Sequence, residues 1–485
     1  MDQTLADAYH SVTSQNLLYQ RNRDRWQFLL ESYIGGDEYR RGNHLTKYYN
    51  ETAQEYEARL AVTPLDNHCR SVISVYTSFL FRDCPDREYG GLSNNMNLYD
   101  FLDDADLDGR SLDAFMRDVG IWAAVFGHCW VITVKPQTNA LTRADELGQG
   151  VRPYVNLITP LTVTDWTWRR EISGAYSLIY LKYVEEANDT FSTIKEWTET
   201  EIITSQVNHN TRQLVARTIE PNGLGRIPAT IVYATRSPVR GIGASMIADI
   251  ADAQKMIYNM TSEVEQSVRI NGHPTLVKTP DVEASAGAGS IALMPDGMDP
   301  GLKPYLLNVS TDIGQIYTSI NSLVDSIDKM ANTGAIRATQ ARTSSGVAQE
   351  AEFMLLNARL AEMADNLELA EEQIWRWFAL YEGTVWDGEI EYADNYNIRD
   401  KKDYLTRLQM AMNMATNDPI LQRIIEFKVR DEVIDDDSPE SVQENQIEQN
   451  NYIVELANGM AIADSTDPVE VAQDVAQDQQ EGEGS

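Results

Sequence analysis

The longest amphipathic pattern in the chain covers residues 347–382, and it limits the possible folds more than any other feature. Apolar side chains recur there in alternating steps of three and four residues, beginning with Phe353, Leu356 and Leu360. This heptad spacing predicts a helix with one continuous apolar seam. At 1.5 Å per residue the helix would be a rod of roughly 54 Å, about three times the mean length of globular helices. Gly383 is expected to end it.

Two shorter segments, 244–270 and 311–331, repeat the same alternation. Each is therefore predicted to be a helix with one apolar stripe. Residues 271–310 between them are rich in Gly, Pro and Ala, which favours a small β-containing subdomain or an irregular loop. Residues 332–346 lack apolar periodicity and are predicted to be a loop. The stripe residues are Ile250, Ile257, Val264, Ile313, Ile316, Ile320, Leu323 and Ile327.

The remaining pattern mixes helices with a β region. Between Trp130 and Tyr233, short β-branched and aromatic runs alternate with turn residues, which predicts an antiparallel β region. A strand-like piece over 384–392 follows the rod. The predicted fold class is α+β, mainly α. Further helices are predicted over Tyr19–Ser32, Leu60–Phe81, Asp113–Phe126, Lys402–Thr416 and Pro419–Val429.

The chain is strongly acidic. Its 485 residues include 40 Lys and Arg against 74 Asp and Glu, a net charge of −34. Residues 431–485 contain 16 acidic residues and no Lys or Arg. Proteins that bind nucleic acid tightly carry basic patches, so this composition argues against a tight grip on DNA. Residues 461–485 lack the hydrophobicity needed to order themselves and are expected to be disordered.

The cysteines and the N-terminus indicate the compartment. Cys69, Cys84 and Cys129 are an odd number without CxxC spacing, which favours reduced, structural thiols. The N-terminus carries acids where a signal peptide needs bases. The longest apolar stretch, Ile121–Val134, is too short to span a bilayer. We expect a soluble protein made in a cytoplasm, with no membrane association.

Motifs of catalytic and cofactor sites are missing from the sequence. There is no GxxxxGK[ST], no GxGxxG after a strand, no HExxH and no GxSxG. The six histidines are dispersed and show no ligand spacing. We therefore expect no enzymatic activity, no cofactor and no bound metal.

One acidic turn resembles half of a calcium-binding loop. Asp104, Asp106, Asp108 and Gly109 match the first half of an EF-hand loop. The twelfth position, where a bidentate Glu should supply affinity, is Phe115. This mismatch favours an acidic, helix-capping turn. The alternative, a metal-dependent enzyme that uses these three aspartates, would bind Ca²⁺ or Mg²⁺ in a calorimetric titration.

The order of these elements resembles the portal proteins of tailed bacteriophages, in particular the siphophage-type portal family. The resemblance covers nearly the whole chain. Its most specific part is Ser345-Gly346-Val347-Ala348, which is similar to the SGxA-type opening of the long helix in that family. A second similarity is Ile158-Thr159-Pro160-Leu161-Thr162-Val163, which looks like a short strand of the family's wing.

The resemblance implies a division of the chain into the parts of a portal subunit. The implied parts are a wing over 1–240, helical at its start and β-rich over 130–235, a first stem helix over 241–270, a clip over 271–310, a second stem helix over 311–331, a tunnel loop over 332–346, a long wing helix and strand over 347–400, a crown over 401–460 and an acidic tail over 461–485.

The resemblance also implies a function. Such subunits form a ring, twelve in the virion, at one capsid vertex, and double-stranded DNA passes through the ring during packaging and ejection. The chain would then be assembled in the host cytoplasm and reside in the virion as a head–tail connector. The implied partners are double-stranded DNA, bound without sequence preference, the large terminase, a head–tail adaptor, and the major capsid and scaffolding proteins.

Candidate site residues follow from this division. Arg337 and Arg342 are the only charges between Lys329 and Glu350, and repeated around a ring they could touch phosphates weakly. Solvated loop charges or salt bridges between subunits are the alternative. The tunnel-loop candidates are Thr333, Arg337, Thr339, Gln340, Arg342, Thr343 and Ser344. The candidates facing terminase or adaptor in the clip are Lys278, Asp281, Glu283, Asp296, Asp299 and Lys303.

Two alternatives remain open at this point. The stripes of the stem helices would pack against a neighbouring subunit in a ring, but they also suit an ordinary helical hairpin core. The whole chain could likewise be a channel-free structural or scaffolding protein of a capsid or another assembly. The segment 332–346 separates these readings, because only a conduit needs an exposed loop with arginines facing an axis.

Overall fold

The computed structural model describes residues 2–138, 142–272, 275–277, 299, 305–307, 312–337, 346–393, 396, 408–412 and 425. The chain divides into two compact units, Met1–Asn397 and Ile398–Ser485. In the second unit the described residues are helical, and Leu408 and Ile425 are buried. The rest of the predicted crown and the whole acidic tail lie outside the described residues.

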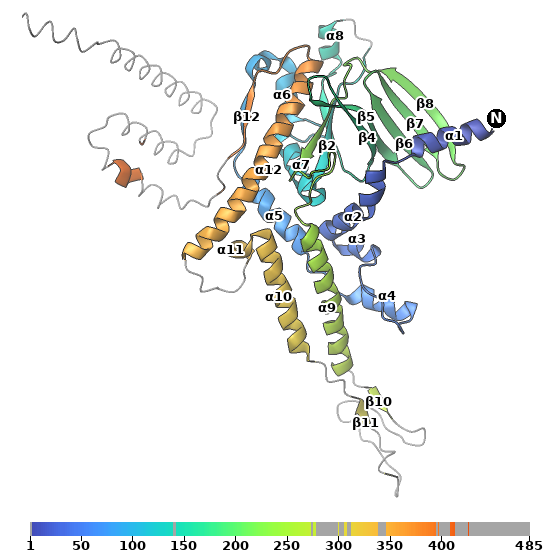
Figure 1. Cartoon of the computed structure of the whole chain (residues 1–485), viewed down its shortest axis with the longest axis vertical. Coiled ribbons are helices and arrows are strands. Elements are labelled where there is room, and N and C mark those ends of the chain that lie inside the picture. The colour runs from blue at the N-terminus through green and yellow to red at the C-terminus, as the bar shows by residue number, and fades with distance from the viewer. Residues whose placement is uncertain are drawn as a thin grey trace, which may run out of the picture. The chain divides into compact units, whose positions relative to one another are not determined.

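Helix α12 (Gly346–Tyr381) confirms the long helix to within one residue at each end (Figure 1). The seam residues Leu356, Leu360 and Leu367 are buried, as the heptad spacing predicts. Gly383 follows with a φ of 71°. Glycine adopts this left-handed conformation without a Cβ clash, and it therefore ends the helix.

Helices dominate the first third of the chain. The predicted helix over Tyr19–Ser32 is confirmed as part of α2, and that over Asp113–Phe126 as part of α7. The elements are α1 (Asp2–Thr13), α2 (Leu17–Ile34), α3 (Gly36–Arg41), α4 (Ala53–Val62), α5 (His68–Leu80), η1 (Gly90–Asn94), α6 (Met96–Asp103), α7 (Leu112–Phe126) and, after the first strands, α8 (Arg143–Gly148).

The single helix predicted over Leu60–Phe81 is wrong, because two helices form there. Helix α4 ends at Val62, and Thr63 is extended, with φ −70° and ψ 118°. The ring of Pro64 disfavours a helical conformation in the residue before it. Helix α5 then begins after Asn67, whose side chain accepts a hydrogen bond from the backbone N–H of Arg70 and caps the new helix.

The β region consists of antiparallel sheets, as predicted. Strand β2 (His128–Val134) pairs with β3 (Tyr154–Ile158) on one side and with β9 (Ala229–Tyr233) on the other. The next five strands form a meander in chain order. Its members are β4 (Val163–Arg170), β5 (Tyr176–Ala187), β6 (Phe191–Thr198), β7 (Glu201–Asn208) and β8 (Gln213–Pro221). Helix α1 packs on this sheet through Val12, which contacts Ile194 and Val207.

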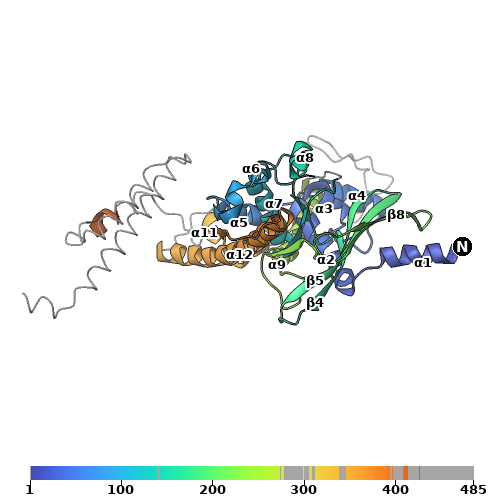
Figure 2. The ribbon, with the colours of Figure 1, turned by 90° about the horizontal axis from the view of Figure 1, so that it is seen from above.

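The main core lies where α7, β2 and α12 come together. Phe126, Trp130 and Trp375, one from each element, are almost completely buried. Helix α12 packs against β9, β2 and α5, and Figure 2 shows it running beside α5 and α7. Strand β1 (Asp86–Glu88) pairs antiparallel with β12 (Glu389–Glu391), which lies inside the strand-like piece predicted over 384–392.

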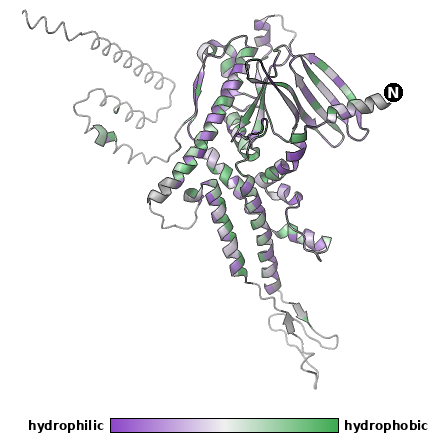
Figure 3. Cartoon of the chain, in the orientation of Figure 1, coloured by the Kyte–Doolittle hydropathy of each residue, from purple (hydrophilic) through white to green (hydrophobic). Residues whose placement is uncertain are grey.

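Helices α9 (Ala248–Gly272) and α10 (Ile313–Ala331) lie side by side (Figure 1). Figure 3 shows hydrophilic and hydrophobic residues alternating along both helices, as the predicted stripes require. Strands β10 (Thr275–Val277) and β11 (Tyr305–Leu307) form an antiparallel pair between them in the chain. Among the described residues, no helix combines the length and apolar character needed to cross a membrane.

Candidate functional site

The apolar stripes of α9 and α10 are buried to different extents. In α9, Ile250, Ile257 and Val264 are at most 5% exposed. Among the predicted stripe residues of α10, only Ile327, near the C-terminal end, is fully buried. The other predicted stripe residues of α10 are half-buried; they are Ile313, Ile316, Ile320 and Leu323. A single chain therefore leaves part of the α10 stripe open to solvent.

Large apolar side chains also lie on the exposed sides of the two helices. Met256 and Val268 of α9 are 51% and 53% exposed, and Tyr317 of α10 is 53% exposed. Single exposed apolar residues are common on protein surfaces. Beside a half-open stripe, however, they widen the apolar area that a second chain could cover.

The segment after α10 differs from the exposed loop that the sequence predicted. Asn332 takes a left-handed conformation, φ 56°, and its N–H bonds back to the last turn of α10. Thr333 is completely buried, and its N–H donates to the carbonyl of Asp328 at 3.0 Å. Residues Gly334–Arg337 then form the short helix α11. The prediction of an exposed loop is thus wrong for 332–337, because backbone capping draws these residues inward.

Arg337 lies in a polar cluster and not on an exposed loop; its side chain is 12% exposed. It donates to the Asp328 carboxylate at 2.8 Å and lies 2.9 Å from Nδ1 of His68. Since the guanidinium can only donate, His68 Nδ1 accepts, and the ring proton sits on Nε2. That nitrogen lies 3.3 Å from Asp66, and the His68 ring lowers the pKa of the Asp66 carboxyl.

The other candidate tunnel-loop residues lie outside the described residues; they are Thr339, Gln340, Arg342, Thr343 and Ser344. Two side chains hold the end of α10 from other elements. The Tyr76 hydroxyl of α5 donates to the carbonyl of Ala331 at 2.7 Å. Arg359 of α12 donates to the carbonyl of Met330 at 2.9 Å. These carbonyls belong to the last helical turn, which lacks intrahelical donors.

The predicted clip is described only in part. Thr275 pairs with Leu307 and Val277 with Tyr305, so the chain enters and leaves this segment as an antiparallel ladder. Asp299 is exposed. The other clip candidates lie outside the described residues; they are Lys278, Asp281, Glu283, Asp296 and Lys303.

The acidic turn after α6 uses its carboxylates internally. Asp104 accepts from the N–H of Gly109 at 2.8 Å, and its carboxylate lies 3.2 Å from Arg152. Asp106 accepts from the N–H of Asp108 at 3.0 Å and pairs with Arg110. Burial raises the pKa of Asp106, but the hydrogen bonds from Asp108 and Arg110 outweigh it and hold that pKa below its usual value.

These contacts favour the capping turn over the calcium loop. Throughout the described parts of the chain, no group of three or more His, Cys, Asp and Glu side chains is arranged to hold a metal ion. The cysteines are free thiols; Cys69 and Cys129 are buried and Cys84 is exposed. Burial raises the pKa of Cys69 to about 12, so this thiol stays protonated at neutral pH.

Comparison with protein families shows to which family the chain belongs. A family described as "Phage portal protein, SPP1 Gp6-like" matches residues 19–448, which is most of the chain. The chain belongs to this portal family. The resemblance inferred from the order of elements is therefore confirmed. No curated protein matches the chain.

Solved structures similar to this portal-family chain include three from gene transfer agent (GTA) particles. A chain in the neck of an empty GTA particle, computed with C6 symmetry, is 9% identical, with a TM-score of 0.44; the match covers 80% of this chain and 96% of that one. A chain in the virion of a native GTA particle is 10% identical (TM-score 0.41; 80% and 94% covered). A chain in the neck of a native GTA particle, computed with C12 symmetry, is 10% identical (0.42; 74% and 89%).

The sequence did not reveal a buried ion pair that fixes the long helix of this portal-family subunit. Glu371, which lies off the apolar seam of α12, is completely buried. Arg87 of β1 pairs with it at 2.6 Å, and the Tyr392 hydroxyl donates to it at 2.6 Å. Burial raises the pKa of Tyr392, and the Glu371 carboxylate raises it further.

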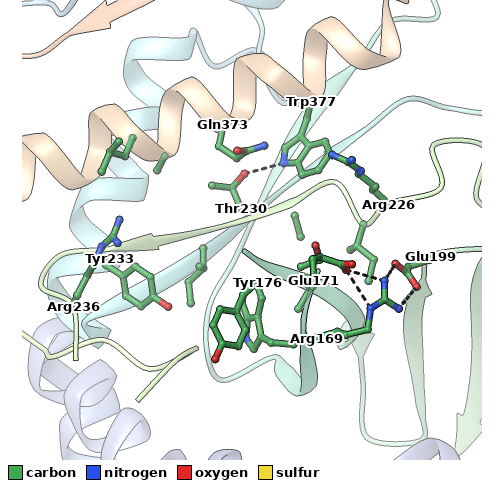
Figure 4. A pocket seen from close by; sticks show the side chains of 18 of the residues that line it. Arg169, Glu171, Tyr176, Glu199, Arg226, Thr230, Tyr233, Arg236, Gln373 and Trp377 are labelled. Carbon is green, nitrogen blue, oxygen red and sulfur yellow. Dashed lines mark hydrogen bonds and ion pairs between the residues drawn. The ribbon is translucent and has the colours of Figure 1, made fainter. Parts of the chain in front are cut away.

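A cleft of about 590 Å³ lies between the meander, β9 and α12 (Figure 4). Its lining includes the buried Ile227 and Ala229 and the aromatic rings of Trp168, Tyr176 and Trp377. The Trp377 indole donates to the Thr230 hydroxyl at 3.2 Å, which fixes that ring. No pattern in the sequence predicted this cleft, because its walls come from segments far apart in the chain.

Proposed function

We propose that copies of this chain form a ring-shaped channel, of twelve subunits, at one capsid vertex. Double-stranded DNA passes through the channel during packaging and ejection. The observation that carries this proposal is membership in the portal family over residues 19–448. Portal proteins are a structural family, not an enzyme family, and the role of head–tail connector in the virion agrees with that membership.

The helix pair α9–α10 supports the channel. The α10 stripe is half-open in one chain, and a neighbouring subunit in a ring would cover it. The exposed side of α10 carries uncharged Gln315, Thr318 and Ser322 in its N-terminal half, and Asp325 and Lys329 follow on the same side. Phosphate contacts from cations would add affinity and slow sliding, so a wall of this kind suits passage of DNA more than binding.

The position of Arg337 reduces the two arginines that could contact DNA to one. Because Arg337 is paired with Asp328 and His68, it is not available to phosphates in this arrangement. Arg342 is then the basic residue of 332–346 that we propose contacts the DNA backbone, without sequence preference. Segment 271–310 is proposed to dock the large terminase and later the head–tail adaptor. The ring is proposed to contact the major capsid and scaffolding proteins.

Mass photometry of the purified chain, with negative-stain images of the same sample, tests the proposal. Twelve subunits of 54.7 kDa give a particle of roughly 660 kDa, with a central hole in end-on views. A compact dimer at high concentration, with no ring at any salt concentration or with scaffolding protein present, would contradict the channel. It would favour a channel-free structural protein.

A further inference from the structure

The cleft beside α12 is surrounded by an unusual concentration of arginines. The chain has 34 more acidic than basic residues. The carboxylates that line the cleft, by contrast, are two, Glu171 and Glu199. Both bind the same side chain, Arg169, at 2.9 and 2.7 Å. Arg169, Arg226 and Arg236 line the cleft, and Arg170 and Arg240 lie over the ring of Tyr176, which also lines it.

Four of these arginines form no direct ion pair among the described residues, and Arg170 is one of them, lying over the ring of Tyr176 at 5.9 Å from its centroid. Arg226 is exposed on the rim (Figure 4). Arg236 donates to the neutral amide of Asn366 at 3.1 Å. Arg240 lies over the ring of Tyr176 at 3.8 Å from its centroid, which is a cation–π contact. Arg169, and to a lesser extent Arg226, lower the pKa of the Glu171 carboxyl, so the chain neutralises the positive charge of the rim only in part.

The cleft also leaves apolar and hydrogen-bonding groups unused. Leu369 of α12 and Tyr176 of β5 line it from two sides and are 51% and 45% exposed. The indole N–H of Trp168 is buried and has no hydrogen-bond acceptor among the described residues, and a buried donor without a partner is costly. An occupant with an apolar side chain and a carboxylate would cover the exposed apolar groups and pair with the arginines of the rim.

We infer that the occupant is a carboxylate-bearing segment of a second copy of this chain, so that the cleft is part of the contact between neighbouring subunits. This inference rests on the proposed ring. A ring is built from two different faces of each subunit that fit each other. Because the chain carries a net charge of −34, most faces of a neighbour repel each other. A basic cleft that the chain neutralises only in part, placed opposite an acidic face, removes that repulsion and fixes the register.

Site-specific cross-linking tests which molecule enters the cleft. The photoreactive residue p-benzoylphenylalanine replaces Leu369 in the full chain, and Leu17 of α2, which is 59% exposed, in the matched control. Irradiation of assembled rings should give covalent dimers at position 369, and the attached peptide should map to an acidic segment of a second copy. Cross-links to another virion protein, or none, would overturn the inference.

Charge reversal tests whether the arginines matter. The double variant Arg226→Glu and Arg240→Glu should lower the fraction of chains in rings by about tenfold or more at the same protein concentration, because like charges would then face each other. Arg21→Glu with Arg23→Glu makes the same charge change on exposed positions of α2 and should assemble as the unmodified chain does. Circular dichroism and thermal melting establish that both variants fold.

The two proposals fail in different ways. If the unmodified chain forms no ring, the channel function fails, and this inference fails with it. Suppose instead that the unmodified chain forms rings, that the double variant forms them equally well, and that the cross-linking variant at position 369 gives no covalent dimers. The channel function then stands and the inference is wrong.

Discussion

Helices α12 and α10 share one sequence pattern and differ in burial. Both place apolar residues in alternating steps of three and four. The α12 seam is closed within one chain, where Leu360, Met363 and Leu367 have no measurable exposure. The α10 stripe stays half-open, apart from Ile327. Periodicity therefore identifies which face of a helix is apolar, but the surrounding elements decide whether the same chain covers that face.

The largest expected loss of stability comes from breaking the ion pair between Arg87 and Glu371, which holds α12 in place. Arg87→Ala removes the cation and leaves the buried Glu371 carboxylate without its charge partner. Breaking a buried pair costs about 3–5 kcal/mol, and urea unfolding would measure the loss. Arg376→Ala is the control, because Arg376 pairs with Glu372 on an exposed part of the same helix and should cost about 0.5 kcal/mol or less. Equal losses would show that α12 does not depend on the pair.

The next largest effect concerns the seam itself. Leu360→Ala should lower the free energy of unfolding by about 2–5 kcal/mol, because the smaller side chain leaves a cavity that the surrounding core does not fill. Leu360→Met keeps the volume and should cost less than about 1.5 kcal/mol. A loss below about 1 kcal/mol for the alanine variant would mean that the seam is not closed in solution.

The dependence of the free energy of unfolding on pH tests whether His128 of β2 is buried in the core. Burial lowers the pKa of His128 to about 3, from about 6.5 in the unfolded chain. Protonation therefore favours unfolding, so the stabilisation is complete above pH 6.5 and is lost as the pH falls toward 3. As the pH falls from 6.5 to 5, the protonation of His128 in the unfolded chain should lower the free energy of unfolding by about 2 kcal/mol.

The control for that series is His128→Gln. Its side-chain oxygen can still accept the hydrogen bond that His128 Nδ1 accepts from the N–H of Gly243, but it does not titrate. Urea unfolding at each pH should show a shallower decline for the variant than for the unmodified chain. Identical declines would mean that His128 does not couple protons to folding.

The smallest effect on the stability of one chain is expected in the open stripe. Leu323→Ala should cost about 1 kcal/mol in dissociated chains, because Leu323 is half-buried. The same change should lower the fraction of chains in rings, as measured by mass photometry. A loss in dissociated chains as large as that of Leu360→Ala would show that the two helices do not differ.

The sequence predicted regular elements well and long-range partners poorly. Repeated apolar spacing placed α12, α9 and α10, because each helix carries its apolar residues on a single face over many turns. The ion pair of Glu371 was not predicted, since its partner Arg87 lies far away in the chain. The contact of Arg337 with His68 was not predicted for the same reason, as His68 reaches it from α5. The break at Pro64 was readable in the sequence, because proline restricts the residue before it.

The family was easier to predict from the sequence than the site residues. The order of elements and the SGxA-like opening of α12 led to the portal family, which the match over 19–448 shows. The cleft could not be predicted, because Trp168, Arg226 and Leu369 converge from separate segments. Pairs of residues brought together only by the fold leave no local periodicity to detect.

The bonds at the end of α10 determine how this subunit would carry mechanical load. Tyr76 and Arg359 hold the carbonyls of Ala331 and Met330, and Arg337 is clamped by Asp328 and His68. In the proposed channel, a force that DNA applied to the chain after residue 337 would reach this junction first. The force would be shared between α5 and α12 instead of unwinding α10 turn by turn. The body of the subunit, and not α10, would then absorb the strain.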